Sequence, residues 1–215
     1  MQSDLESEIQ FARQHNIGDI LRRSAMRFPD KTAIICGQTE WTYKAFDTAC
    51  NQLARHLLAR GISAGDKIAV IARNSHGFAA IRFAIARIGA VLVPINFMLN
   101  ANEVRYILNS SRSKMLALGP EFIDIGLEAI SKGTDVEITL GLPSEHQSSS
   151  LKTDLRFEGL LTGDATAPEI HLDDRSLAQI VYTSGTEAMP KGAMLSHSAV
   201  LWQYTSCIID GEMTT

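Results

Sequence analysis

The sequence predicts an α/β fold in which helices and a β-sheet form layers. Short apolar runs alternate with amphipathic segments between residues 17 and 140, which is the pattern of this fold class. The run 67–72 is apolar on both faces, as expected for a strand covered on both sides in a parallel sheet. The chain has 215 residues, 45% hydrophobic and 20% charged, which is enough for a sizeable core.

The N-terminal part predicts a helix, a hairpin and a second helix. Apolar residues recur at helical spacing from Ile17 to Phe28, and Pro29 ends that run. Residues 32–36 predict a strand, followed by a turn and a short return strand at 40–41. Thr42 is the expected N-cap of the next helix, which ends near Gly61. Its apolar stripe consists of Phe46, Ala49, Cys50, Leu53 and Leu57.

Further strands and helices alternate up to residue 140. The strands are expected at 67–72, 90–95, 115–118 and 136–140, and the helices at 76–88, 100–108 and 122–130. Asn74-Ser75 and Asn100 are the expected caps of the first two helices. The pattern then fades, and 141–176 reads as an irregular connection. A short apolar strand follows at 178–181, and another helix starts at Ser196 or His197 and continues to about residue 206.

Composition excludes several classes of protein. The net charge of −4 and the pI of about 5.9 argue against a nucleic-acid-binding surface. The cysteines Cys36, Cys50 and Cys207 are odd in number and lack metal-ligand spacing, so a reducing cytoplasm is the expected location. Cys36 is expected to be a small buried hydrophobe. The polar, acidic N-terminus is unlike a signal peptide.

The longest apolar stretch, 78–95, predicts a buried helix and a strand. A membrane span needs about 20 mostly apolar residues, and this stretch is interrupted by Arg82 and Arg87. We expect both arginines to lay their stems on apolar surface and to keep their charged heads in water. No membrane span is predicted.

Residues 182–192, Tyr-Thr-Ser-Gly-Thr-Glu-Ala-Met-Pro-Lys-Gly, form the candidate site, hereafter the phosphate loop. Gly185 and Gly192 permit backbone angles that other residues resist. Hydroxyls and successive backbone N–H groups can form an anion-binding concavity, and Lys191 adds a positive charge. The alternative is a Gly/Ser/Thr turn with a solvated lysine. The Walker A pattern is excluded because Pro190 and Gly192 flank the lysine.

This loop resembles the phosphate-binding signature of the adenylate-forming superfamily, which includes acyl-CoA synthetases. The family pattern is Tyr/Phe-Thr-Ser-Gly-Thr-Thr-Gly-x-Pro-Lys-Gly. The matching residues here are Thr183, Ser184, Gly185, Thr186, Pro190, Lys191 and Gly192. Glu187 stands where threonine is usual, and Ala188 where glycine is usual. Family-like segments upstream, including Thr42-Tyr43, Gly65-Asp66, Asn74-Ser75 and 89–96, extend the resemblance to about residues 17–204.

The resemblance implies that 1–215 is the N-terminal portion of an acyl-CoA synthetase-like fold, without the family's C-terminal domain. Within it, 17–140 is the α/β body, 141–176 the connection, 177–192 the strand and phosphate loop, and 196–206 a helix. The implied reaction activates a carboxylic acid, a fatty acid by default, as acyl-adenylate with ATP and Mg²⁺, and transfers it to coenzyme A. The expected partners are the acid, coenzyme A and the remainder of the same protein.

The implied site residues all lie in the phosphate loop. Lys191 and Thr186 are the catalytic candidates, acting on the leaving pyrophosphate. The nucleotide-binding candidates are Thr183, Ser184, Gly185, Thr186, Glu187, Lys191 and Gly192. The family's usual magnesium carboxylate has no counterpart before residue 215, so no metal ligand is assigned. Glu187 is expected to repel a triphosphate unless it points away or shares the magnesium ion.

Other residues receive ordinary structural interpretations. His76 and His197 are expected to cap or pack at helix starts. Trp202 and Tyr204 are expected to belong to the core, with the lining of an acyl or nucleotide pocket as the alternative. The remaining histidines, His15, His56, His146 and His171, lack metal-ligand spacing. Two alternative functions stay open at this point: a non-catalytic nucleotide-binding or scaffold module, and a peptide-synthetase-type adenylation domain.

Overall fold

The protein is built around one large mixed sheet and one small hairpin. The computed structural model describes residues 9, 15–150, 152–183 and 189–212. The large sheet contains β3 (Lys67–Ile71), β4 (Val91–Pro94), β5 (Ser113–Leu118), β6 (Ile138–Gly141), β7 (Leu155–Arg156), β8 (Leu177–Thr183) and β9 (Lys191–Ser196). Its spatial order is β7-β6-β5-β3-β4-β8-β9. Neighbouring strands are parallel except for β8 and β9, which form an antiparallel hairpin.

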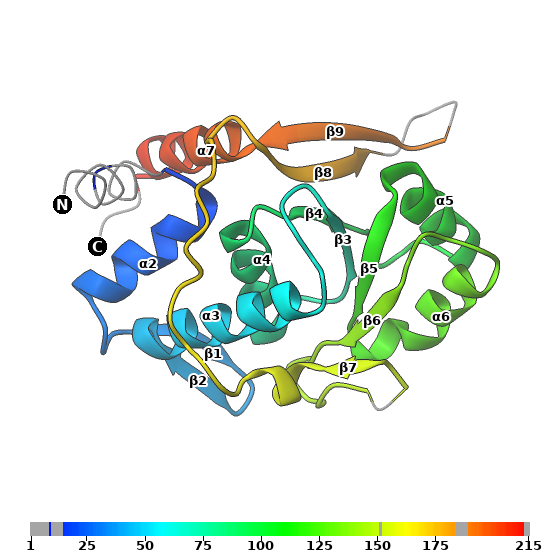
Figure 1. Ribbon diagram of the computed structural model, residues 1–215, viewed down its shortest axis with the longest axis horizontal. Helices are drawn as coiled ribbons and strands as arrows, with labels where there is room; N and C mark the ends of the chain where they lie inside the picture. Colours follow the sequence, from blue (N-terminus) through cyan, green and yellow to red (C-terminus); the bar gives the residue numbers. More distant parts are fainter. Residues whose placement is uncertain (1–8, 10–14, 151, 184–188, 213–215) are drawn as a thin grey trace.

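Helices cover both faces of the sheet, as expected for an α/β fold (Figure 1). The helices are α2 (Ile17–Arg27), α3 (Tyr43–Ala59), α4 (His76–Arg87), α5 (Ala101–Ser111), α6 (Ile123–Ser131) and α7 (His197–Asp210). One core cluster joins α3 and α4 to Ile68 and Val70 of β3. A second joins α5 and α6 to Ala69 and Ile71 of the same strand. The alternation along β3 therefore separates two cores, because successive side chains point to opposite faces.

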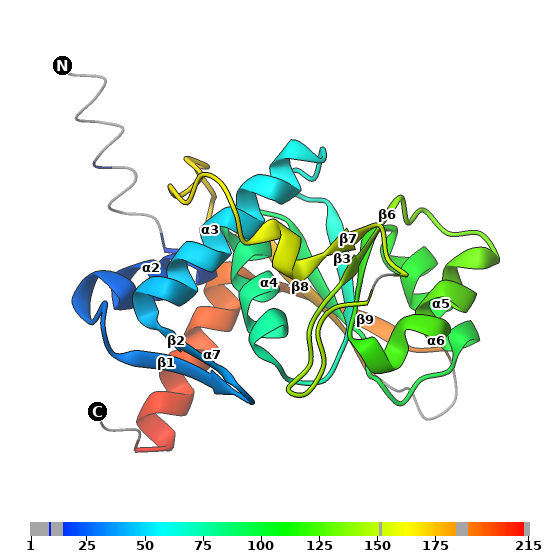
Figure 2. The same ribbon diagram turned by 90° about the horizontal axis from the view of Figure 1, so that it is seen from below.

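The small hairpin lies at the end of the molecule that carries α2 and α3. Its strands are β1 (Thr32–Cys36) and β2 (Thr39–Thr42), paired antiparallel. Both views place it away from α5 and α6 (Figures 1 and 2). Cys36 is only half-buried here, so the expectation of a buried cysteine is wrong. The reason is that β1 belongs to this two-stranded hairpin at the periphery, where Ile35 is 76% exposed.

The helix starts follow the predicted capping chemistry. The side chains of Thr42, Ser75 and Asn100 accept hydrogen bonds from backbone N–H groups in the first turns of α3, α4 and α5. Ser196 does the same for α7, so it is the cap and His197 is the first helical residue. Asn100 with Glu103 forms a capping box. These caps satisfy backbone donors that have no partner inside the helix.

The predicted elements between residues 17 and 140 are all present, with boundaries shifted by a few residues. Among the described residues, four elements were not predicted: β7, β9 and the 3₁₀ turns Pro120–Phe122 and Phe157–Leu160. Phe157 is almost fully buried, so the irregular connection contributes to the core. Further along it, the Arg55 guanidinium on α3 donates to the carbonyl of Thr166 at 2.7 Å. The segment 161–176 thus runs beside α3 and α2 before it enters β8 (Figure 1).

The expectation for the two arginines of α4 is wrong for Arg87. Its residue exposure is 9%, and its guanidinium forms an ion pair with Asp47 of α3 instead of reaching water. Arg82 is half-buried and donates to Gln179 of β8 at 3.1 Å. It also donates to the Tyr204 hydroxyl of α7. Helix α4 packs against α3, and the buried Arg87 head therefore meets Asp47 of α3 instead of water. Within the ranges described, no helix is long and apolar enough to cross a bilayer.

Candidate active site

The β8–β9 hairpin brings the two described ends of the phosphate loop together. Thr183 is the last residue of β8, Lys191 is the first residue of β9, and the two are register partners. Both residues are exposed. Ser184, Gly185, Thr186, Glu187 and Ala188 lie outside the described residues, so their predicted roles stay predictions. The structure places Thr183 and Lys191 side by side at the end of this hairpin.

This end of the hairpin lies at an edge where ligands commonly bind in α/β proteins. Strand β8 runs parallel to β4, with Leu92 paired to Gln179. Thr183 is therefore the carboxyl end of a strand that runs parallel to its neighbour, and in open α/β sheets ligands bind in the crevice outside these ends. An exposed hydroxyl and an exposed ammonium group there suit an anionic ligand. Lysine acts in such a site as a flexible point charge.

The backbone of Gly192 differs from the expectation, while its nucleotide-binding role stays a prediction. It lies in β9 and is not among the described glycines with positive φ, so unusual backbone angles do not explain it. A Cβ atom at this position would lie 2.7 Å from Cγ2 of Ile180 and 3.1 Å from Cζ of Tyr182. The residue is small because these two side chains of the facing strand lie over the hairpin. Sequence alone suggested freedom of the backbone, whereas the structure indicates close packing.

Two tyrosine hydroxyls join this hairpin to α5. The hydroxyl of Tyr106, on α5, donates to the carbonyl oxygen of Pro190 at 3.2 Å. The hydroxyl of Tyr182, on β8, donates to Oγ of Ser110 on α5 at 2.9 Å. Sequence reasoning missed both. Tyr106 and Ser110 are spaced i, i+4, which indicates a shared helix face but not what that face contacts.

His197 is fully buried at the base of the hairpin, at 0% exposure. Its Nδ1 atom accepts a hydrogen bond from the backbone N–H of Ile17 at 3.3 Å, joining the starts of α7 and α2. Burial lowers the pKa of this imidazole, and the charges of Asp19 and Asp174 oppose the shift. Nε2 has no hydrogen-bond partner among the described residues. The predicted packing role is confirmed, since a neutral ring is needed for Nδ1 to accept.

His76 also has a packing role, as predicted. Its ring meets that of Trp41 edge-on, with centroids 5.2 Å apart, and burial lowers its pKa. Trp202, in contrast, is 72% exposed, so the expectation that it belongs to the core is wrong. Helix α7 buries only its face at His197, Val200 and Leu201. Tyr204 is half-buried and packs beside that face, as predicted.

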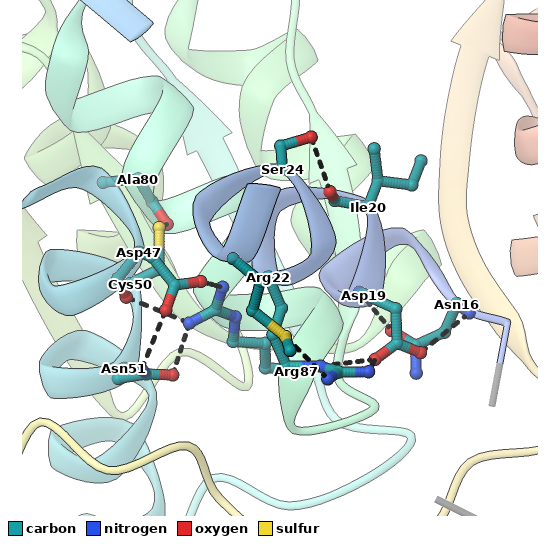
Figure 3. A network of polar contacts seen from close by, with 11 residues as sticks. Asn16, Asp19, Ile20, Arg22, Ser24, Asp47, Cys50, Asn51, Ala80 and Arg87 are labelled. Atoms are coloured by element: carbon teal, nitrogen blue, oxygen red, sulfur yellow. Dashed lines mark hydrogen bonds and ion pairs between the residues drawn. The ribbon is translucent and has the colours of Figure 1, made fainter. Parts of the chain in front are cut away.

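A second polar cluster is formed by residues of α2, α3 and α4 (Figure 3). Arg87 donates to the carbonyl of Asp47 at 3.0 Å and to the side chain of Asn51. Cys50 is buried beside it, and burial raises its pKa to about 12. Such a thiol is inert, because the thiolate is the reactive form. Over the described part of the chain, no group of three or more histidines, cysteines and carboxylates is arranged to hold a metal ion.

Comparison with known proteins shows that the chain is similar to an enzyme family. The sequence profile of the family described as AMP-binding enzyme matches residues 21–214. The 4-hydroxybutyrate–CoA ligase 2 of Metallosphaera sedula is 30% identical over 199 residues, which cover 90% of this chain and 36% of that protein. The peroxisomal benzoate–CoA ligase of Arabidopsis thaliana is 30% identical over 207 residues, covering 91% and 36% respectively.

The fold is also similar to solved structures. The crystal structure of the N-terminal domain of FACL13 from Mycobacterium tuberculosis has a TM-score of 0.75 and 29% identity to this chain. The similarity covers 90% of this chain and 47% of that one. The chain spans about a third of the length of the curated relatives that it matches, 36% for each of the two ligases named above.

Proposed function

The chain belongs to the AMP-binding enzyme family, and from that premise we propose that it is the ATP-binding N-terminal portion of an acyl-CoA synthetase. The proposed reaction has two steps. A carboxylate attacks the α-phosphate of ATP and releases pyrophosphate, and the thiol of coenzyme A then displaces AMP from the acyl-adenylate. The proposed role of this chain is to hold the β- and γ-phosphates during the first step.

The observation that carries the proposal is the pairing of Thr183 with Lys191 at the open end of the β8–β9 hairpin. An exposed hydroxyl and an exposed cation on opposite strands can contact one polyphosphate from two sides. Phosphoryl and nucleotidyl transfer depend mainly on positioning and on neutralising charge. In this proposal Lys191 offsets charge on the leaving pyrophosphate, and Thr183 donates a hydrogen bond to it. Thr186 has the same proposed function on the basis of sequence alone.

The substrate acid is proposed only as a class. The two relatives described above are named for 4-hydroxybutyrate and for benzoate, which share a carboxylate but little else. This supports acid–CoA ligation rather than a particular acid, and we propose fatty acids as the first to test. Coenzyme A as acceptor and Mg²⁺ on the triphosphate are likewise proposals from the family. A cytoplasmic location also remains a proposal, supported by the number and spacing of the cysteines.

The test compares Lys191→Ala with Lys132→Ala, which removes an exposed lysine from the end of α6. MgATP and tripolyphosphate binding to the chain are measured by calorimetry. A lost charge-assisted contact is worth roughly 1.5–3 kcal/mol, so Lys191→Ala is expected to weaken binding about ten- to a hundredfold. Lys132→Ala is expected to leave binding unchanged. Equal affinity of wild type and Lys191→Ala would refute the assignment of the phosphate loop.

The test of the proposed chemical step uses the complete polypeptide that contains these residues. Pyrophosphate release across a panel of aliphatic and aromatic acids identifies the substrate class. Release that requires a carrier protein instead of coenzyme A would favour a peptide-synthetase-type adenylation domain. ATP binding without pyrophosphate release with any acid would favour the non-catalytic module. The presence of Glu187 in the phosphate loop is the feature of the sequence that supports this alternative.

A further inference from the structure

We propose that Tyr106 is a positioning residue for Lys191, acting through the carbonyl oxygen of Pro190. This inference rests on the proposed function, in which Lys191 contacts the leaving pyrophosphate. Tyr106 lies on α5, far from the phosphate loop in sequence, and its hydroxyl donates to Pro190 O at 3.2 Å. It touches no reacting group, so its effect on the reaction is indirect.

The bond acts on Lys191 because a peptide unit is planar. The carbonyl of Pro190 and the N–H of Lys191 belong to one such unit, which has no soft dihedral between them. A hydrogen bond that orients the carbonyl therefore also orients the bond that enters the Cα atom of Lys191. The lysine side chain is long and flexible. Fixing its Cα atom reduces the volume that its ammonium group samples.

Pro190 needs this contact because it cannot join the hairpin as other residues do. Proline has no N–H to donate to a strand ladder, and the described register begins at the next pair, Lys191 with Thr183. Pro190 is a half-buried residue, and a backbone carbonyl that leaves water without a hydrogen-bond partner is costly. Among the described residues, the hydroxyl of Tyr106 on α5 donates to the Pro190 carbonyl, and no residue of the facing strand β8 is paired with Pro190.

Helix α5 can restrain the residues at the ends of the phosphate loop because its own position is fixed by buried side chains and a capped first turn. Val104, Ile107 and Leu108 are at most 1% exposed, and a capping box closes the first turn. The same helix holds the other strand of the hairpin through the bond from Tyr182 to Ser110. Both strands at the base of the phosphate loop are therefore tied to one rigid element. Binding groups supported in this way lose less freedom when a ligand arrives.

The experiment compares Tyr106→Phe with Tyr204→Phe in the whole chain. Each change removes one hydroxyl from a half-buried tyrosine and keeps the ring. Tyr204 bonds to Arg82, away from Pro190, and so controls for a general loss of stability. The measurements are tripolyphosphate and MgATP affinity by calorimetry, amide hydrogen exchange of Lys191 and Gly192 by NMR, and thermal unfolding.

We expect Tyr106→Phe to weaken both ligands about two- to tenfold and to accelerate exchange at Lys191 by a similar factor, because one neutral hydrogen bond is lost. Tyr204→Phe is expected to change neither. Unchanged affinity and exchange in Tyr106→Phe would overturn the inference and leave the proposed function intact. Equal losses in both variants would also overturn it, in favour of a stability effect. If the wild-type chain binds neither ligand, the proposed function is refuted. Amide exchange at Lys191 would then still decide whether the Tyr106 hydroxyl orders the backbone at Lys191, since faster exchange in Tyr106→Phe alone would support this and equal exchange would contradict it.

Discussion

The buried ion pair between Arg87 and Asp47 provides a sharp test of the packing of α3 against α4. The exposed fractions of these two side chains are 7% and 20%. We expect Asp47→Ala to destabilise the protein strongly, because it leaves the guanidinium buried without its counter-charge (Figure 3). Removing one partner of a buried pair costs about 3–5 kcal/mol.

The cost should fall at the lower end of that range, at about 3 kcal/mol. Arg87 retains two acceptors in the variant, since the backbone carbonyl of residue 47 lies 3.0 Å away and Asn51 is unchanged. For a domain of this size, 1 kcal/mol corresponds to roughly 2–4 °C in melting temperature, so Tm should fall by about 6–12 °C. Urea unfolding and differential scanning calorimetry would measure the two quantities.

Two further variants make the reasoning falsifiable. Glu128→Ala breaks the surface pair with Lys132, whose side chains are 58% and 46% exposed, and should cost about 0.5 kcal/mol or less. The double change Asp47→Leu with Arg87→Met removes both charges and should be more stable than Asp47→Ala alone. An Asp47→Ala protein that melts within about 2 °C of wild type would refute the argument, as would a double variant less stable than the single one.

Two other predictions concern the hairpin and its base. Gly192→Ala should destabilise the protein by about 1–3 kcal/mol, because the new Cβ would lie 2.7 Å from the buried Ile180 side chain. Gly159→Ala meets no atom within 4 Å, so it should change urea unfolding little, and equal effects of the two would contradict the steric role of Gly192. His197 has a lowered pKa, so the unfolded chain takes up its proton first, and stability should fall as the pH drops below about 6.5. His197→Asn should flatten part of that decline between about pH 7 and 5, and unfolding profiles of identical slope would exclude this histidine as a contributor.

The sequence alone determined the class of fold and most elements of the first 140 residues. Local physics decides these features: a run such as 67–72 is apolar on both faces, and Thr42, Ser75 and Asn100 carry the side chains that satisfy the first N–H groups of a helix. The phosphate loop is also a prediction from the sequence alone, made possible because its hydroxyls, glycines and lysine lie within one short segment. The chemistry proposed for this loop follows from residues that are neighbours in the sequence, so no long-range contact had to be known.

Only the tertiary structure decided which distant residues support that loop. Strand β9 was missed because its residues, 191–196, follow the loop without a clear period, and pairing with β8 defines it. The surroundings of the Arg87 side chain and of the Gly192 Cα atom were misjudged for the same reason. The neighbours of an arginine on an apolar helix decide whether its guanidinium contacts water or a carboxylate. A position can require glycine because the backbone adopts an unusual angle there, or because a neighbouring side chain leaves no room for a Cβ atom. The partners concerned, Asp47 and Ile180, are separated from these residues in the chain, and packing alone brings them together.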